Sequence, residues 1–231
     1  MSRFWNFIKN ADNTGELQLY GEIADSTWWG DEVTPKDFKK DLDALGDISV
    51  LNVYINSPGG DVFAGQAIHS MLKRHKAKVN VYIDGLAASI ASVIAMAGDK
   101  IIMPKNAMMM IHNPWTWAFG NSNDFRKLAD DLDKIRESMI AAYLEKAKDL
   151  GEENLAELLD AETWLTAEDA LAYGFIDEID ESKAVAACVD KKYLKAYKNI
   201  PKELLKEPES TDKTTKSNLE KEKILLEIDL I

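Results

Sequence analysis

The chain has 231 residues, of which 46% are hydrophobic, and its formal net charge is −12 at pH 7. This length predicts one substantial core plus a tail, and the negative charge disfavours general nucleic-acid binding, which needs a basic surface. Cys188 is the only cysteine, so no intrachain disulfide can form, which is consistent with a reducing compartment. The longest apolar stretch, residues 86–98, is too short to span a bilayer. We expect a soluble, cytoplasmic protein without membrane or nucleic-acid partners.

The N-terminal residues 1–15 are polar, with a few aromatic side chains among them. We expect a frayed terminus whose aromatic side chains pack on the body; the alternative is a segment that orders on a partner subunit. Residues 16–23 alternate between polar and apolar side chains, which predicts a strand. Thr34 is the expected cap of a helix that Pro35 begins and Gly46 ends.

Strands and helices alternate through the centre of the chain. Apolar runs predict strands at residues 48–55, 79–83, 100–103 and 107–111, and helical spacing of apolar residues predicts helices at 62–75 and 88–97. Since short links join these elements, the pattern predicts an α/β fold with a largely parallel sheet.

The second half of the chain begins with a long amphipathic pattern at residues 123–151. A single helix of that length exceeds the usual size for a compact domain, so it lies across the domain or projects to meet a neighbour. A short helix at 153–159, another capped by Thr166 and a strand at 175–179 complete the expected domain.

The composition changes after residue 180, so we divide the chain into an N-terminal segment (1–15), one domain (16–180) and a C-terminal extension (181–231). Residues 207–218 contain few hydrophobic side chains, which indicates a flexible linker. Residues 224–231 are apolar again; they form either an element that docks on a partner or merely an apolar end.

Ser89 lies where a strand is expected to turn into a helix, among alanine residues. Small neighbours let a substrate backbone come close, and the free N–H groups of a helix N-terminus face developing negative charge. The alternative is a buried helix in which Ser89 only bonds back to its own turn.

A glycine turn lies on one side of this serine. Gly59 and Gly60 follow the expected strand at 48–55, and parallel neighbouring strands end on the same side of a sheet, so the two turns can share a crevice. The backbone N–H groups of Gly60 and Ile90 can then point at one spot, as an oxyanion hole requires. Alone, a Gly-Gly pair usually marks only a tight turn.

His112 follows the expected strand at 107–111 and can reach a serine on the neighbouring turn to take its proton. The alternative is a histidine bonded to a loop carbonyl. A carboxylate behind the imidazole would fix its tautomer, and Asp160 and Glu162 are candidates, although 40 acidic residues leave the choice open. Three histidines without paired spacing disfavour a metal site, and we expect no cofactor.

Four motifs occur in the same order, and near the same spacings, as in the proteolytic subunits of Clp proteases, which the chain resembles over roughly residues 16–180. They are NSPGG (56–60), GLAASIASVIAMAG (85–98), MIHNP (110–114) and TWLTAEDALAYGFID (163–177). The resemblance implies an α/β fold of the crotonase type and a serine endopeptidase that works through an acyl-enzyme.

The resemblance also implies roles for particular residues. Ser89 would be the nucleophile, His112 the general base, and the N–H groups of Gly60 and Ile90 the oxyanion hole. Residues 116–123 would form the handle that leads into a helix interlocking with a facing ring. The implied partners are polypeptide substrates, further copies of the chain in stacked rings, and an ATPase unfoldase.

The sequence departs from the family pattern in three places. The position of the usual triad aspartate holds Glu162, with Asp160 as the alternative acid two residues earlier. The N-terminus does not resemble the family's ATPase-docking loop, and the tail beyond residue 180 has no counterpart in the housekeeping subunit. These features resemble phage-encoded relatives that act in head maturation on scaffold and capsid proteins.

Two other functions fit parts of the pattern. Acyl-CoA enzymes of the crotonase type use a similar pair of N–H groups, but they need no serine–histidine pair. A structural or scaffolding subunit that has kept the fold and lost activity is favoured only by the substituted acid at Glu162.

Overall fold

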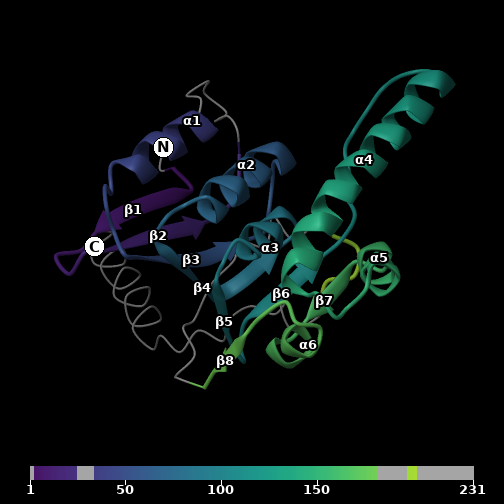
Figure 1. Ribbon diagram of the computed structural model, residues 1–231. Helices are drawn as coiled ribbons and strands as arrows, with labels where there is room; N and C mark the ends of the chain where they lie inside the picture. The colour runs from purple at the N-terminus through teal and green to yellow at the C-terminus, as the bar shows by residue number, and fades with distance from the viewer. Residues whose placement is uncertain (1–2, 25–33, 182–196, 202–231) are drawn as a thin grey trace, which may run out of the picture. The chain divides into compact units, whose positions relative to one another are not determined.

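The computed structural model describes residues 3–24, 34–181 and 197–201 (Figure 1). The chain divides into two compact units, residues 1–199 and 200–231, and the fold described below is that of the first. The expected linker at 207–218, the apolar end at 224–231 and Cys188 lie outside the described residues.

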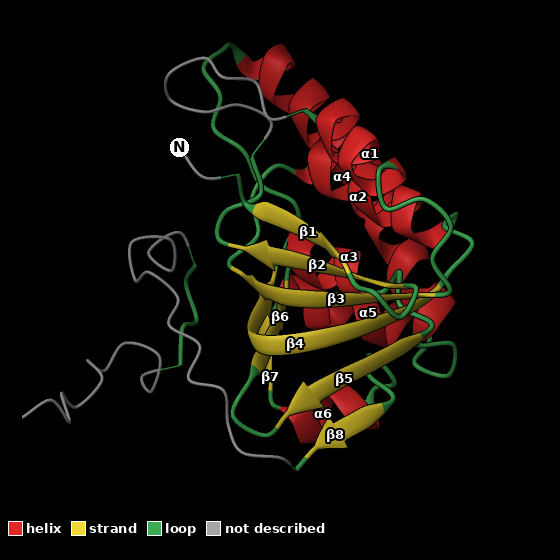
Figure 2. Ribbon diagram, turned by 90° about the vertical axis from the view of Figure 1, so that its left-hand side faces the viewer, coloured by secondary structure: helices red, strands yellow, loops and turns green. Residues whose placement is uncertain are grey.

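An eight-stranded sheet forms the centre of the domain, with strands in the order β1-β2-β3-β4-β5-β8 and with β6 beside β4 and β7 beside β6 (Figure 2). The strands are β1 (Trp5–Lys9), β2 (Thr14–Tyr20), β3 (Val50–Ser57), β4 (Lys78–Ala88), β5 (Lys100–Pro104), β6 (Met108–Ile111), β7 (Thr163–Leu165) and β8 (Glu178–Asp180). All neighbours are parallel except β1 with β2 and β6 with β7. The predicted α/β fold with a largely parallel sheet is confirmed.

Helices follow the parallel strands, as the alternation predicts. They are α1 (Pro35–Asp43), α2 (Val62–Lys73), α3 (Ile90–Ala95), α4 (Ser122–Lys146), α5 (Glu152–Asp160) and α6 (Ala167–Ala172). Figure 2 shows α1 and α2 together on one side of the sheet. The cap of α1 is the predicted one, because the Thr34 side chain accepts a hydrogen bond from the Asp37 N–H group.

The N-terminus differs from the expected frayed end. Residues 5–9 form β1, which pairs antiparallel with β2. Trp5 is 5% exposed, its indole N–H donates to an Asp41 carboxylate oxygen at 3.0 Å, and its ring meets the Phe38 ring edge-on. The aromatic side chains therefore pack on the body as expected, but they do so within a strand. The burial of the Trp5 ring and the backbone hydrogen bonds to β2 fix this strand. The segment is too short to show clear alternation of polar and apolar residues, so its sequence does not predict a strand.

Three element boundaries also differ from the expected ones. The long helix ends at Lys146 and not near residue 151, because the backbone of Ala147 leaves the helical region and Gly151, with a φ of 78°, precedes α5. The expected strand at 175–179 is shorter, since Phe175 is fully buried in the turn before β8. Strand β4 continues to Ala88, so α3 is correspondingly shorter.

Strand β4 belongs to two parts of the sheet. Its residues 80–82 pair with β5, and its residues 86–88 pair with β6. On its other side the register with β3 shifts between Ile55 and Ser57. The end of β4 therefore lies between the ends of β3 and β6, and the turns that follow all three strands meet at one place.

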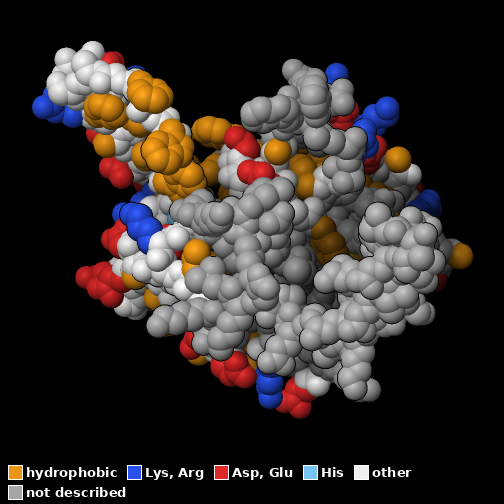
Figure 3. All heavy atoms as spheres, turned by 180° about the vertical axis from the view of Figure 1, so that it is seen from behind, with side chains coloured by type: hydrophobic (Ala, Val, Ile, Leu, Met, Phe, Trp, Pro, Cys, Tyr) orange, Lys and Arg blue, Asp and Glu red, His pale blue; other side chains and the backbone are white. Residues whose placement is uncertain are grey.

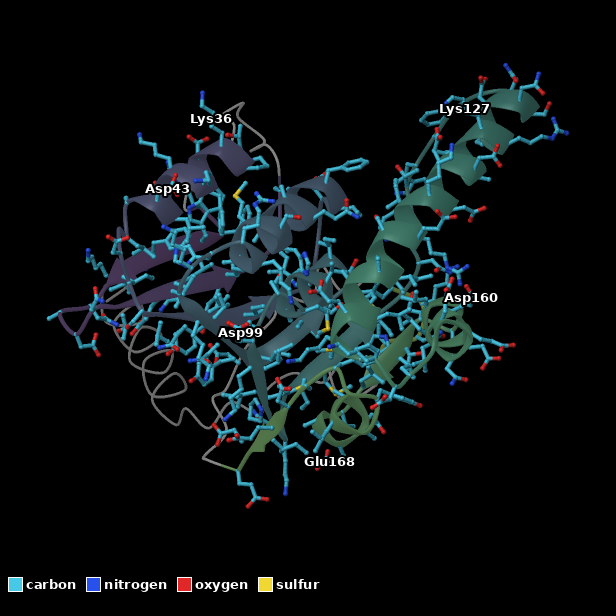
Figure 4. All side chains as sticks on the ribbon, in the orientation of Figure 1. Lys36, Asp43, Asp99, Lys127, Asp160 and Glu168 are labelled. Atoms are coloured by element: carbon cyan, nitrogen blue, oxygen red, sulfur yellow. The ribbon has the colours of Figure 1, made fainter. Side chains whose placement is uncertain are left out.

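Helix α4 projects from the domain (Figure 1). Its buried residues, Met139, Ile140 and Tyr143, all lie near its C-terminal end. Lys127, labelled in Figure 4, marks the distant part, where side chains face outward. Among the described residues, the helix is therefore held to the domain mainly by its C-terminal half.

The packing of α1 on the N-terminal strand can be tested by mutation. Phe38 is fully buried and its ring contacts those of Trp5 and Phe7. We expect Phe38→Ala to lower the free energy of unfolding by about 3–5 kcal/mol, since it leaves a cavity in the core. The control Phe63→Ala removes a ring that is 66% exposed and should cost less than about 0.5 kcal/mol. Urea denaturation measures both, and equal losses would contradict this packing.

Candidate active site

Ser89 lies at the predicted strand-to-helix turn, between β4 and α3, in a strained conformation. Its φ is 55° and its ψ is −129°, a combination that L residues other than glycine rarely adopt. The turn is fixed by a hydrogen bond of 2.9 Å from the Ser89 N–H group to the Met110 carbonyl of β6. Backbone strain of this kind persists where the surrounding structure enforces it, and it is typical of functional sites.

Ser92 supports this turn from inside the helix. Its hydroxyl donates to the Ser89 carbonyl at 2.5 Å and shares a hydrogen bond of 2.7 Å with the hydroxyl of Tyr143. Tyr143 is fully buried, and burial raises the pKa of its phenol. The C-terminal end of α4 is thus linked by hydrogen bonds, through Tyr143 and Ser92, to the backbone of the candidate nucleophile.

Glycine residues allow the neighbouring turn to come close to Ser89. A Cβ atom at Gly59 would lie 2.7 Å from the Cβ of Ser89, which is closer than side chains tolerate. At Gly60 the φ is 148°, and a Cβ atom would lie 1.9 Å from the Ile23 carbonyl oxygen. Both glycines are therefore required by close approach of backbone, and the predicted shared crevice is present.

The backbone N–H groups of Gly60 and Ile90, beside Ser89, have no acceptor among the described residues. The Ile23 N–H group donates to the Gly59 carbonyl, and the Ile23 carbonyl accepts from the Asp61 N–H group. These two hydrogen bonds do not use the N–H group of Gly60, which lies between Gly59 and Asp61 in the chain. Ile90 is the first residue of α3, where the N–H group has no partner within the helix. Among the described residues, neither Gly60 nor Ile90 has a hydrogen-bond acceptor for its N–H group, as an oxyanion hole requires.

His112 follows β6, and its Nε2 atom lies 2.7 Å from the Ser89 hydroxyl. Both side chains are buried, with exposed fractions of 7% and 8%. Burial lowers the pKa of the His112 imidazole, and the nearby Glu162 carboxylate raises it. Since burial has the larger effect, the imidazole is neutral near pH 7 and can accept a proton from Ser89.

The lowered pKa predicts the shape of the pH profile. A general base works in its neutral form, so we expect the acidic limb of kcat/KM to have its midpoint below the usual histidine value of 6.5. Glu162→Gln removes the carboxylate that raises the pKa of His112, and the midpoint should move further down. Rates on a short fluorogenic peptide between pH 4.5 and 8 measure this; a midpoint that rises in Glu162→Gln would contradict the assignment.

The two candidate acids lie in different surroundings. Asp160, labelled in Figure 4 at the end of α5, accepts hydrogen bonds from Asn113 at 2.7 Å and from Arg136 at 2.9 Å. Glu162, whose φ is 51°, accepts two backbone hydrogen bonds from residues 198 and 199. Neither carboxylate makes a hydrogen bond to His112 among the described residues. Glu162 is the acid whose charge acts on the pKa of His112, which favours it over Asp160.

Tyr197 also lies at this site, although sequence patterns do not point to it. Its ring stands edge-on to the rings of His112 at 5.3 Å and Trp164 at 5.9 Å between centroids. Its hydroxyl donates to the Pro58 carbonyl oxygen. No local pattern identifies this residue, because it belongs to the C-terminal extension and is far from the other site residues in sequence.

A cavity of about 210 Å³ opens beside Ser89 and His112, next to the glycine turn. Within the described parts of the chain, no group of three or more His, Cys, Asp or Glu side chains is placed to hold a metal ion. No described helix combines the length and apolar character needed to cross a membrane.

A hydroxyl hydrogen-bonded to an imidazole, beside two N–H groups that have no acceptor among the described residues, is an arrangement suited to the chemistry of serine hydrolases. Comparison with known proteins narrows the class. A family model described as Clp protease matches residues 38–183, which is more than half of the chain. The chain belongs to the Clp protease family and is a serine-type peptidase.

Similar curated proteins carry the name ATP-dependent Clp protease proteolytic subunit. The protein from Deinococcus radiodurans is 36% identical over 141 residues, which cover 60% of this chain and 68% of the relative. The one from Leuconostoc citreum is 38% identical over 142 residues, 60% of this chain and 70% of the relative. The one from Streptococcus equi subsp. equi is 39% identical over 153 residues, 63% of this chain and 76% of the relative.

Proposed function

We propose that the protein is an endopeptidase in which Ser89 attacks the carbonyl carbon of a peptide bond. His112 takes the hydroxyl proton and passes it to the leaving amine, while the N–H groups of Gly60 and Ile90 hold the oxyanion. Water then hydrolyses the acyl-enzyme with His112 again as the base. The observation that supports this most directly is the 2.7 Å separation of the Ser89 hydroxyl and the His112 Nε2 atom.

Glu162 is the proposed orienting acid, because its charge raises the pKa of His112. Asp160 is engaged by Asn113 and Arg136. The acyl-CoA alternative gives the hydrogen-bonded Ser89 and His112 no role, and membership of the Clp protease family also argues against it. A purely structural subunit would not need to retain that pair.

Covalent labelling tests the proposal. The native protein is treated with a fluorophosphonate probe, and the modified peptide is mapped by mass spectrometry. Modification of Ser89 together with cleavage of casein is the expected result. A folded, assembled protein that stays unlabelled would exclude the serine peptidase mechanism.

We further propose that the peptidase works as a closed homo-oligomer of stacked rings. Exposed aromatic side chains precede and begin α4: Trp115, Trp117, Phe119 and Phe125. Figure 3 shows hydrophobic side chains along the projecting arm, where a contact with another copy would bury them. Native mass spectrometry should find an oligomer, and a monomer at micromolar concentration would count against it.

The partners are proposed from the relatives and from the C-terminal extension. The names of the curated relatives include ATP dependence, which supports an ATPase unfoldase as partner. The residues beyond 183 lie outside the family match and support the alternative of a phage head-maturation protease acting on scaffold and capsid proteins in the cytoplasm. Cleavage of folded substrates with and without an added ATPase unfoldase distinguishes the two, because a requirement for the unfoldase would support the first.

A further inference from the structure

Residues 197–199 of the extension cross the crevice that contains the candidate catalytic residues. On one side lies the cavity of about 210 Å³, lined by Ser89 and Tyr197. On the other lies a second cavity of about 500 Å³, lined by Glu162 and by residues 198 and 199. His112, Pro114 and Trp115 line both cavities. The crossing segment therefore separates two parts of one crevice.

The backbone of this segment is held as a peptide ligand would be. One Glu162 carboxylate oxygen accepts the N–H groups of Lys198 and Asn199, each at 2.7 Å. The Asn199 side-chain amide donates to the Ala161 carbonyl oxygen at 2.9 Å. These three hydrogen bonds hold the segment at its backbone and at the Asn199 side chain.

The side chain of Tyr197 occupies the space over the candidate nucleophile. Its ring lies against His112 and Trp164, and its hydroxyl reaches the Pro58 carbonyl oxygen in the glycine turn. Burial raises the pKa of the phenol to about 12, with a hydrogen bond to Ser89 acting in the opposite direction. The phenol therefore takes up part of the space beside Ser89 that a substrate carbonyl would enter.

We propose that residues 197–199 are an intramolecular inhibitor seated in a peptide-binding subsite of this crevice. The subsite takes an aromatic side chain between His112 and Trp164, followed by two residues whose N–H groups bind Glu162. Its ligand class is an extended peptide with that pattern, and its occupant in the free protein is the chain's own segment.

Release of the segment has two effects on the site. It opens the approach to Ser89, and it frees the Glu162 carboxylate from Lys198 and Asn199 so that the carboxylate can orient His112. Peptide substrates that carry an aromatic residue compete with the segment for the same contacts. This inference rests on the proposed peptidase function.

Variants of the full chain test the inhibitor. The second-order rate constant for fluorophosphonate labelling of Ser89 is compared between wild type and Tyr197→Ala. Loss of the ring contacts and of the phenol hydroxyl should raise it roughly 10-fold. The matched control is Tyr173→Ala, which removes a partly exposed tyrosine at the end of α6, outside both cavities, and should leave the rate constant unchanged. An equal or lower rate constant in Tyr197→Ala would overturn the proposal.

A second measurement separates this proposal from the proposed function. Amide hydrogen exchange at Lys198 and Asn199 should be slow in the wild type and at least 10-fold faster in Tyr197→Ala, whether or not the protein is active. Fast exchange of both amides in the wild type would overturn the inhibitor even if Ser89 is labelled. Slow exchange without labelling in any variant would support the bound segment and reject the peptidase.

Discussion

Replacing His112 with alanine is expected to lower kcat/KM for a short peptide on the order of 10⁴-fold or more. Without the imidazole, the Ser89 hydroxyl has no base at 2.7 Å and stays protonated, so it is a poor nucleophile near pH 7. Labelling of Ser89 by the fluorophosphonate should fall in parallel, because it depends on the same proton transfer.

His69→Ala is the matched control for this variant. His69 lies on α2, is partly buried, and has a pKa that burial lowers in the same way as that of His112. It does not line the cavity beside Ser89. Activity should be nearly unchanged in His69→Ala, and a loss of less than 10-fold in His112→Ala would show that another group acts as the base.

The second large effect is expected from Gly59→Ala. The new Cβ atom would lie 2.7 Å from the Cβ of Ser89 and 2.8 Å from the Ala88 carbonyl oxygen, and the φ of 98° disfavours any L residue. The glycine turn and Ser89 must therefore move apart, which would displace the Gly60 N–H group from the proposed oxyanion position. Loss of one oxyanion donor costs about 10²–10³-fold in kcat, and we expect a loss of that size.

Gly151→Ala is the control for Gly59→Ala, because it introduces backbone strain at a positive φ without pushing neighbouring atoms away. Gly151 also has a positive φ, 78°, but no heavy atom lies within 4 Å of a Cβ atom built there. This variant should lose about 1 kcal/mol of stability and keep its kcat. Thermal unfolding and peptide hydrolysis measure both variants, and equal kcat values would exclude the steric argument for Gly59.

Much of the fold was predictable from the sequence because the signals are local. Thr34 and Thr166 cap the helices they were expected to cap, and the apolar runs of the central strands form the parallel sheet. The meeting of Ser89, Gly60 and His112 followed from one geometric rule, that parallel strands end on the same side of a sheet. The small-residue turn and the strand-end histidine were therefore informative together, although each was ambiguous alone.

The remaining features depend on contacts between distant parts of the chain. The division of β4 between β5 and β6 is not visible in its apolar pattern, since both halves are buried. The proposal of Glu162 over Asp160 rests on the effect of its charge on the pKa of His112 and on the hydrogen bonds that Asp160 makes elsewhere. Arg136 and Asn113 carry no motif that links them to Asp160. Tyr197 lies 85 positions beyond His112, and composition placed it in a tail.

The hydrogen bonds that support Ser89 from behind have a consequence for how its chemistry responds to acidity. Tyr143 keeps its phenol proton throughout the range in which the enzyme can work, because burial raises its pKa, and Ser92 does not titrate. The two side chains that support the backbone of the candidate nucleophile, Ser92 and Tyr143, thus stay uncharged, while the imidazole of His112 gains or loses a proton. We therefore expect changes of rate with pH to follow the protonation of His112 and not a rearrangement of the turn that holds Ser89.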